Sequence, residues 1–286
     1  MKTALLLEGG GMRGLYTSGV LDTLMDTGLS FDALVGVSAG ALFGVNYKSR
    51  QKGRALRYNL RYACDPRYMS VWSLLTSGDI MNRKFCFDRL VNELDPFDFD
   101  AFKSSPEEFY AVVTRLSDGK AEYIKLDDLR VSDQMEYLRA SGSLPFVSRP
   151  VKIGGELYLD GGIADSIPYE WVRSQGYDRI VAVLTRPADY RKPSGGERAA
   201  KLYYRKYPEF AKAAISRPER YNAEVELIRS AEGGDGLFVL RPTRHIDIGR
   251  LEKDSAVMQR MYDLGVSDCQ GAMDSLMKFM QTSSLC

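Results

Sequence analysis

Two short apolar runs, each followed by a stretch with helical spacing, open the chain. The runs are residues 4–7 and 31–37, and the helical stretches are residues 15–25 and 39–47. Uninterrupted apolar runs of this length are typical of buried strands, whereas apolar residues three or four positions apart are typical of helices. Two strand–helix units in succession predict an α/β protein whose parallel sheet has right-handed crossovers.

Hairpins and further helices are predicted downstream. Asp118-Gly119 and Gly154-Gly155 are turn signals, and each lies between two segments suited to antiparallel strands. The expected strands are residues 109–116, 122–126, two arms within 151–159, 180–184 and 237–240, and the expected helices are residues 132–139, 199–232 and 251–280. We expect a surface loop at residues 186–198, because proline, glycine and charged residues are concentrated there.

Residues 48–95 predict helical and irregular structure, with an apolar and aromatic segment at residues 68–75. Large apolar side chains are usually buried, so we expect this segment to pack as a helix in the core. The alternative is a lid or a lipid-facing segment over a functional site.

Composition removes several classes of function. The chain has 39 basic and 38 acidic residues, so no charge excess favours nucleic acid or an anionic surface. A single histidine and scattered cysteines argue against structural zinc and predict reduced thiols in the cytoplasm. The cysteines are Cys64, Cys86, Cys269 and Cys286. Glu8 ends the first apolar run too early for a signal peptide, and no run approaches the roughly 18 apolar residues of a membrane span.

A Gly-x-Ser-x-Gly sequence, residues 36–40, joins the second apolar run to the helix after it. Strand, sharp turn and helix in this order are the setting of a nucleophile elbow, with Ser38 strained at the strand tip. Gly36 and Gly40 lack a Cβ, so strand and helix can pass close together, and the helix N-terminus offers N–H groups to an oxyanion. The alternative is a serine that only caps the helix.

A glycine-rich loop, residues 9–14, follows the first apolar run. Its Gly-x-Gly-x-x-Gly spacing also fits dinucleotide binding, which requires an acidic residue at the end of the next strand. That strand ends in Ser38, and Asp32 lies at its start, which argues against a nucleotide. Both loops leave the carboxyl ends of parallel strands, so we expect the glycine N–H groups to form an oxyanion hole opposite Ser38. Arg13 either adds positive charge at this rim or forms a salt bridge at the helix start.

A serine nucleophile needs a general base, for which there are two candidates. His245 completes the order Ser38, Asp160, His245 of an α/β-hydrolase triad, but it lies in a basic segment and the elbow follows only the second strand. We therefore expect His245 to be a surface residue without a catalytic role. Asp160 follows a predicted strand and precedes two glycines. It can act as a base only if burial raises its pKa and an oxyanion hole stabilises the charge; otherwise it is a turn aspartate bonded to its own backbone.

Together these motifs resemble the patatin-like phospholipase family, in its bacterial branch. The motifs are residues 8–14, 36–40, 140–145 and 160–162, in the order and near the spacing of that family, and the resemblance covers residues 3 to about 185. It implies a three-layer α/β/α fold with a mainly parallel sheet. The implied organisation is a catalytic core at residues 1–185 and a mostly helical extension at residues 186–286, packed on the core as one continuous domain.

The resemblance also implies roles for individual residues. Ser38 is the nucleophile and Asp160 the base. The oxyanion loop is Gly9, Gly10, Gly11 and Met12, with Arg13 as a supporting cation and Gly14, Gly36, Gly40, Gly161 and Gly162 as supporting glycines.

We therefore expect a serine hydrolase of lipid acyl esters, of phospholipase A or lysophospholipase type, that forms an acyl-serine intermediate. No cofactor and no metal is expected. The expected partner is a lipid ester at a membrane surface, met from the cytoplasm, and not a nucleic acid. Two alternatives remain: a non-catalytic lipid- or nucleotide-binding module, and a triad esterase that uses His245. The lipid, the ester position, acyl transfer to an alcohol and the oligomeric state are left open.

Overall fold

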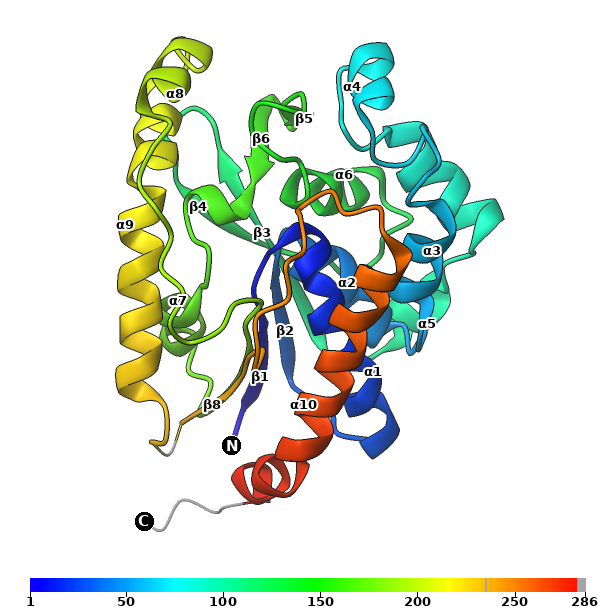
Figure 1. The fold of residues 1–286 in the computed structure, drawn as a ribbon, viewed down its shortest axis with the longest axis vertical. Helices are drawn as coiled ribbons and strands as arrows, with labels where there is room; N and C mark the ends of the chain where they lie inside the picture. The colour runs from blue at the N-terminus through cyan, green and yellow to red at the C-terminus, as the bar shows by residue number, and fades with distance from the viewer. Residues whose placement is uncertain (235, 282–286) are drawn as a thin grey trace.

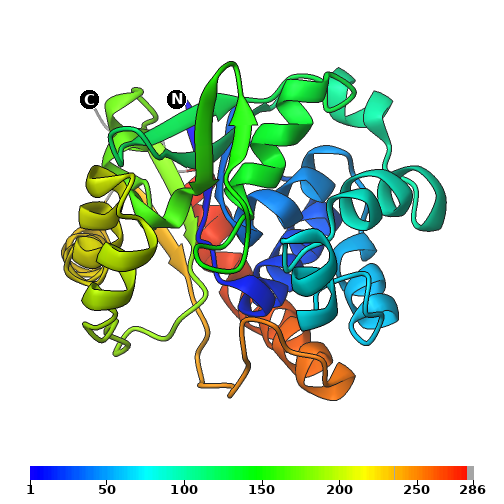
Figure 2. The same ribbon diagram turned by 90° about the horizontal axis from the view of Figure 1, so that it is seen from above.

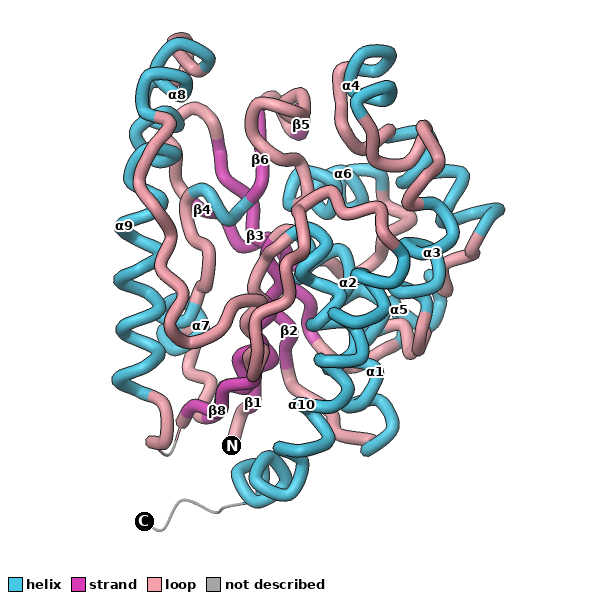
Figure 3. Tube along the Cα trace, in the orientation of Figure 1, coloured by secondary structure: helices cyan, strands magenta, loops and turns pink. Residues whose placement is uncertain are grey.

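The computed structural model describes residues 1–234 and 236–281, so Cys286 lies outside the described residues. A central sheet of eight strands (magenta in Figure 3) is covered by helices on both faces (Figures 1 and 2). The strands are β1 (Thr3–Leu7), β2 (Ala33–Val37), β3 (Glu108–Arg115), β4 (Ala121–Lys125), β5 (Val151–Ile153), β6 (Glu156–Asp160), β7 (Arg179–Val183) and β8 (Leu237–Leu240).

Ten α-helices and three shorter or wider helical segments accompany these strands in the described part of the chain. The α-helices are α1 (Leu15–Thr27), α2 (Ala39–Lys48), α3 (Arg54–Tyr62), α4 (Val71–Ser77), α5 (Phe99–Ser104), α6 (Ser132–Ser141), α7 (Tyr169–Ser174), α8 (Glu197–Tyr203), α9 (Pro208–Ala231) and α10 (Ser255–Gln281). The others are the 3-10 turns η1 (Gly11–Gly14) and η3 (Gly161–Ile163) and the π-helix η2 (Phe85–Leu94).

The sheet is parallel at its centre and antiparallel at one side. Pairing follows the order β5-β6-β3-β2-β1-β7-β8, with β4 also paired to β3. The strands β3, β2, β1, β7 and β8 are parallel neighbours, whereas β4, β5 and β6 pair antiparallel. The carboxyl ends of the parallel strands therefore meet at one edge, near the top of Figure 1.

Strand β3 brings two distant segments together. Strand β4 occupies one edge of β3 along residues 110–114, so β2 and β6 share the other edge. Val37 of β2 pairs with Val112, and Asp160 of β6 pairs with the next residue, Val113. Because β2 runs parallel to β3 and β6 runs antiparallel, the two strands meet end to end. The residue after Val37 is thus placed beside Asp160.

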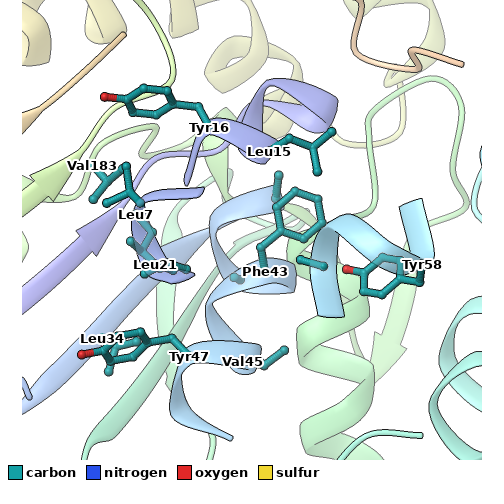
Figure 4. Packing of buried hydrophobic residues seen from close by; sticks show 14 of the residues in the cluster. Leu7, Leu15, Tyr16, Leu21, Leu34, Phe43, Val45, Tyr47, Tyr58 and Val183 are labelled. Atoms are coloured by element: carbon teal, nitrogen blue, oxygen red, sulfur yellow. The ribbon is translucent and has the colours of Figure 1, made fainter. Parts of the chain in front are cut away.

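Alternate side chains of the strands enter two separate cores. Leu5, Leu7 and Leu34 face α1, α2 and α10, in a cluster that also contains Tyr16, Phe43 and Tyr58 (Figure 4). Leu6, Val35 and Ile180 face α7 and α9 on the opposite side. All these strand residues are fully or almost fully buried. The three-layer α/β/α arrangement and the mainly parallel sheet are therefore confirmed.

The structure corrects one expectation. Residues 68–75 are not a packed core helix: Tyr68 and Met69 are buried, but Val71, Trp72 and Leu75 in α4 are 67%, 61% and 77% exposed. The expected surface loop is confirmed for residues 186–196, after which α8 begins, and two of its side chains, Arg186 and Lys192, line a pocket. The predicted hairpins, the helix after Ser38 and the strand 237–240 are confirmed.

No helix within residues 1–234 and 236–281 has both the length and the apolar character needed to cross a membrane.

Candidate active site

Ser38 lies in a strained turn between β2 and α2. Its φ of 56° and ψ of −122° are unusual for a residue with a side chain. The turn is tight because α2 begins directly over the end of β1: a Cβ on Gly40 would lie 2.3 Å from the carbonyl oxygen of Leu7. Glycine at position 40 is therefore required by the close approach of two backbones.

The hydroxyl of Ser38 points at Asp160 and not at the helix. Ser38 Oγ donates to Asp160 Oδ2 at 2.5 Å, and the side chain makes no capping bond to α2. Both residues are buried. The structure thus brings together the predicted serine and aspartate, and Ser38 does not act as a simple helix cap.

Asp160 is fixed by its own turn as well as by Ser38. Its second carboxylate oxygen, Oδ1, accepts from the N–H of Gly162 at 2.8 Å, and its carbonyl accepts from Thr114 Oγ1 at 2.9 Å. The turn bond expected for an ordinary turn aspartate is therefore present, but it uses only one carboxylate oxygen. Burial raises the pKa of Asp160, and the opposing effects of the Arg217 charge and the Ser38 hydrogen bond do not cancel this rise.

The end of α6 and the residues that follow it support both Ser38 and Asp160. Ser141 Oγ accepts from the backbone N–H of Ser38 at 3.0 Å, and the carbonyl of Ser143 accepts from the N–H of Asp160 at 3.0 Å. Residues 140–145 are recognisable in the sequence as a small-residue segment, but sequence reasoning predicted no contact for Ser141. The small polar side chain of Ser141 next to Gly142 was the signal that could have identified this contact.

The glycine loop packs directly against the serine. A Cβ on Gly9 would lie 2.7 Å from the Cβ of Ser38, and the carbonyl of Gly9 accepts from Thr185 Oγ1 at 3.2 Å. Within the described residues, the N–H groups of Gly10 and Gly11 donate to no backbone carbonyl. The N–H of Met12 instead donates to the carbonyl of Arg250 at 3.2 Å, which argues against the expected role of Met12 as an oxyanion donor.

Two pockets of opposite character meet at Ser38. One is apolar and extends between α2, α3, η2 and α6; its lining includes Met12, Leu42, Phe43, Tyr58, Met69 and Leu138. The other is polar and is lined by the glycine loop, Asp160 and several cationic side chains. Ser38, Gly11 and Leu144 line both pockets. A ligand at Ser38 can therefore place an apolar part on one side and a charged part on the other.

Three other residues considered from the sequence are His245, Asp32 and Arg13, and only Arg13 lies at the Ser38 site. His245 is exposed in the connection between β8 and α10 and lines neither pocket at Ser38. Asp32 accepts from the N–H of Thr3 at 2.6 Å, at the start of the strands and away from the glycine loop. Arg13 lines the polar pocket, and its Nε is buried without a hydrogen-bond partner. It forms no ion pair within 4 Å among the described residues, so the salt-bridge alternative is not supported.

Comparisons with known proteins identify relatives whose matched regions cover 65–83% of this chain. The uncharacterized protein YjjU of Escherichia coli is 29% identical over 192 residues, 65% of this chain and 53% of YjjU. A lysophospholipase nte1 of Emericella nidulans is 30% identical over 202 residues, 67% of this chain and 12% of its own length. A lysophospholipase NTE1 of Scheffersomyces stipitis is 25% identical over 253 residues, 83% of this chain and 16% of its own length. The chain thus spans about half of YjjU and a small part of these lysophospholipases.

A solved structure and two family models were also matched. VipD from Legionella pneumophila aligns with a TM-score of 0.48 and 14% identity, over 96% of this chain and 67% of VipD. A model for a domain of unknown function (DUF6363) matches residues 207–281. The relatives are both bacterial and fungal, so the bacterial branch stays a prediction. The model for patatin-like phospholipases matches residues 5–171, more than half of the chain, and this protein belongs to the patatin-like phospholipase family.

Proposed function

We propose that this protein hydrolyses acyl esters of lipids through a Ser38–Asp160 dyad, as a phospholipase A or lysophospholipase. The observation that carries the proposal is the 2.5 Å hydrogen bond from Ser38 Oγ to Asp160 Oδ2, formed in a buried site at a strained elbow. A hydroxyl held this way can give its proton to the carboxylate as it attacks. A non-catalytic binding module would have no need for this pairing or for the strain.

The first half of the reaction transfers the acyl group to the serine. Asp160 Oδ2 takes the proton of Ser38 Oγ while Oγ bonds to the ester carbonyl carbon, and the carbonyl π electrons move to its oxygen. The tetrahedral intermediate then re-forms the carbonyl and breaks the bond to the alcohol oxygen. That oxygen takes the proton from Asp160, and the alcohol leaves.

The glycine loop is the proposed oxyanion hole. The N–H groups of Gly10 and Gly11 have no backbone acceptor in the described part of the chain, and they belong to the loop packed against Ser38. Each well-aimed donor of this type is worth roughly 3–4 kcal/mol in the transition state. Arg13 acts as the supporting cation from the rim of the same pocket. Gly9 supports them by letting the loop approach the serine.

The second half releases the acyl group. Water gives a proton to Asp160 as its oxygen attacks the acyl-serine carbonyl. Collapse of the second intermediate breaks the bond to Oγ, which takes that proton back, so serine and carboxylate are restored. An alcohol in place of water gives acyl transfer by the same steps. The apolar pocket beside Ser38 is suited to the acyl chain throughout.

The rate should depend on the ionisation of Asp160. Because the carboxylate form is the base and burial raises the pKa of Asp160, kcat/KM for a soluble short-chain ester should fall on the acid side at a pH above the usual carboxyl range of about 4. In Arg217→Gln this acid limb should move to higher pH, because the Arg217 charge favours the carboxylate. A limb that stays unmoved in Arg217→Gln but disappears in His245→Ala would contradict the dyad.

We also propose that the protein meets its substrate at a membrane surface. Val71, Trp72 and Leu75 on α4 are exposed, and so are Phe146, Leu202 and Tyr203 near α8. We call these six residues the apolar rim. Figure 1 draws α4 and α8 at the end toward which the parallel strands run. Phe146 links the two parts, because its N–H donates to Tyr204 and the next carbonyl, of Val147, accepts from Ile80.

The apolar rim predicts a difference between two substrates. The double variant Trp72→Ser, Leu75→Ser should hydrolyse phospholipid in vesicles about tenfold more slowly, because it loses exposed apolar area that enters the bilayer interface. Its rate on a dissolved short-chain ester should stay within twofold of the wild type. Val131→Ser, an exposed apolar residue outside the rim, is the matched control and should change neither rate. Equal loss on both substrates would contradict a surface role.

A cytoplasmic location is part of the proposal. Within residues 1–234 and 236–281, Cys64, Cys86 and Cys269 form no disulfide, as expected for a protein in a reducing compartment.

A further inference from the structure

The polar pocket at Ser38 collects positive charge from four separate parts of the chain. Arg13 lies in the glycine loop, Arg186 and Lys192 follow β7, Arg217 lies on α9, and Arg250 precedes α10. We call these five residues the cation cluster. Four of the five lie beyond residue 171, where the patatin-like family model ends. The C-terminal part of the chain therefore supplies most of this charge.

The carboxylates near the cation cluster form no ion pair with it among the described residues, although the charges of Glu8, Asp160 and Glu224 oppose part of the effect of burial on the pKa values of Lys192 and Arg217. Its pocket contains two acidic residues, Glu8 and Asp160. Glu8 accepts from the N–H of Thr185 at 2.6 Å, and Asp160 accepts from Ser38 and Gly162. Ion pairs near this pocket join other residues instead, such as Arg191 with Glu226. Among the described residues, no member of the cluster forms an ion pair within 4 Å.

Burial makes this unpaired charge costly. The Nε atoms of Arg13 and Arg217 are both buried, and neither has a hydrogen-bond partner among residues 1–234 and 236–281. Burial, and next the charge of Arg217, lower the pKa of Lys192 to about 7. The same two kinds of cause, burial and the charge of Arg186, lower the pKa of Arg13 to about 10. Cations that destabilise one another in a protein pocket are stabilised when an anion enters it.

Contacts with aromatic rings and with α9 position two members of the cluster, Lys192 and Arg186. Lys192 Nζ lies 3.8 Å from the ring centre of Tyr221, and the Arg186 guanidinium lies 4.1 Å from that of Tyr190. The side chain of Asn222 on α9 bonds the backbone N–H and carbonyl of Lys192 at 2.8 and 3.1 Å. The loop after β7 is thereby fixed to α9, so the cations are positioned before a ligand arrives.

We propose that the cation cluster binds a phosphate group next to Ser38, and that it selects acyl esters whose alcohol part is anionic and carries no ammonium group. The inference rests on the proposed function, because Ser38 lines both this pocket and the apolar pocket. An ester carbonyl at Ser38 would place its acyl chain among apolar side chains and its phosphate among the five cations.

The charge balance explains the selectivity. A phosphate can accept charge-assisted hydrogen bonds from several arginine and lysine donors. A choline or ethanolamine group would add a further positive charge to the five in this pocket, where Glu8 and Asp160 already accept other hydrogen bonds. A neutral glycerol would leave the buried cations unpaired. Both are therefore disfavoured relative to a phosphate monoester.

Binding can be measured without turnover on the Ser38→Ala variant. The ligands are three soluble esters with one acyl chain: hexanoyl glycerol phosphate, hexanoyl glycerol and hexanoyl glycerophosphocholine. Calorimetric titration should give at least tenfold tighter binding of the phosphate monoester than of either other ligand. Adding Lys192→Gln or Arg217→Gln should weaken its binding tenfold or more and change hexanoyl glycerol binding less than threefold. Lys212→Gln, which removes one exposed charge from the same helix α9, is the matched control and should have no effect.

Titration with inorganic phosphate distinguishes a phosphate group of the substrate from a free phosphate ion in the pocket. If the phosphate belongs to the substrate, inorganic phosphate should compete with hexanoyl glycerol phosphate for Ser38→Ala. If it is a free ion, inorganic phosphate should instead tighten hexanoyl glycerol binding; either result supports the phosphate site. Equal binding of the three esters with no effect of phosphate, tighter binding of the choline ester, or unchanged selectivity in both variants would overturn it. Failure of the proposed function would be seen in a different measurement: Ser38→Ala itself would hydrolyse the ester at the wild-type rate.

Discussion

Replacing Ser38 by alanine should lower kcat for ester hydrolysis by about 10³-fold or more, and Asp160→Asn should cost a similar factor. Ser38→Ala removes the proposed nucleophile. Asp160→Asn removes the proposed proton acceptor but keeps an oxygen for the N–H of Gly162, so the turn is preserved. Because the two residues act as a unit, the double variant should be little worse than either single variant. Initial rates on a soluble ester, with substrate near saturation, are the measurement.

Two controls are needed: one tests whether His245 takes part in catalysis, and the other tests whether Asp160→Asn still folds. His245→Ala should keep the wild-type rate, since His245 is exposed and away from Ser38. Asp160→Asn should have an equal or higher melting temperature at neutral pH. Burial raises the folded-state pKa of Asp160, so its ionisation destabilises the fold as the pH rises through that pKa, and a neutral amide avoids this cost. A 10³-fold loss in His245→Ala, or less than tenfold in Asp160→Asn, would contradict the dyad.

Gly40→Ala should destabilise the protein by about 3 kcal/mol or prevent folding. The added Cβ would lie 2.3 Å from the carbonyl oxygen of Leu7, and 2.8 Å from its carbonyl carbon. Both belong to the backbone of β1, so no side-chain rotation relieves the clash. The helix would have to move away from the strand and carry Ser38 with it. Chemical denaturation, followed by the residual esterase activity of any folded material, measures both consequences.

Gly271→Ala is the matched control for Gly40→Ala. Gly271 lies in the long helix α10, is exposed, and has nothing within 4 Å of the position of an added Cβ. Alanine there should stabilise the protein by about 0.5–1 kcal/mol, because it has the higher helix propensity. Equal effects of the two substitutions would contradict the close strand–helix approach at the elbow.

The elbow was predictable from sequence because its signals are local. An apolar run, two glycines around Ser38 and a small-residue helix lie together within residues 31–47, and each is explained by the geometry of one turn. The position of Asp160 was also predictable from its strand and the glycines after it. The contact between them was not, since it depends on β2 and β6 meeting end to end along one edge of β3.

Apart from Arg13, which lies in the glycine-loop motif, the cation cluster had no local signal. Its other four members come from three segments, and each is an ordinary charged residue in its own sequence context. Arg186 and Lys192 lie in a stretch whose proline and glycine content correctly predicts a loop, but composition does not say which side chains turn inward. The side chains of Asn222 and Tyr221 decide this, about thirty residues later.

The error at α4 has a similar origin. Burial of large apolar residues is a statistical tendency of whole proteins, and it does not fix the orientation of a short helix at the end of the molecule. Here Ser73 faces inward and bonds the carbonyl of Asp79, so Trp72 and Leu75 face outward. The same signal supported a lipid-facing segment, the alternative that agrees with the exposed surface.

The central claim is that Ser38 becomes the covalent nucleophile by giving its proton to Asp160. A fluorophosphonate probe, followed by mass spectrometry of the labelled peptide, tests this most directly. We expect stoichiometric labelling of Ser38 in the wild type and in His245→Ala, and labelling at least a hundredfold slower in a folded Asp160→Asn variant. Labelling of another residue, or an unchanged labelling rate in Asp160→Asn, would contradict it.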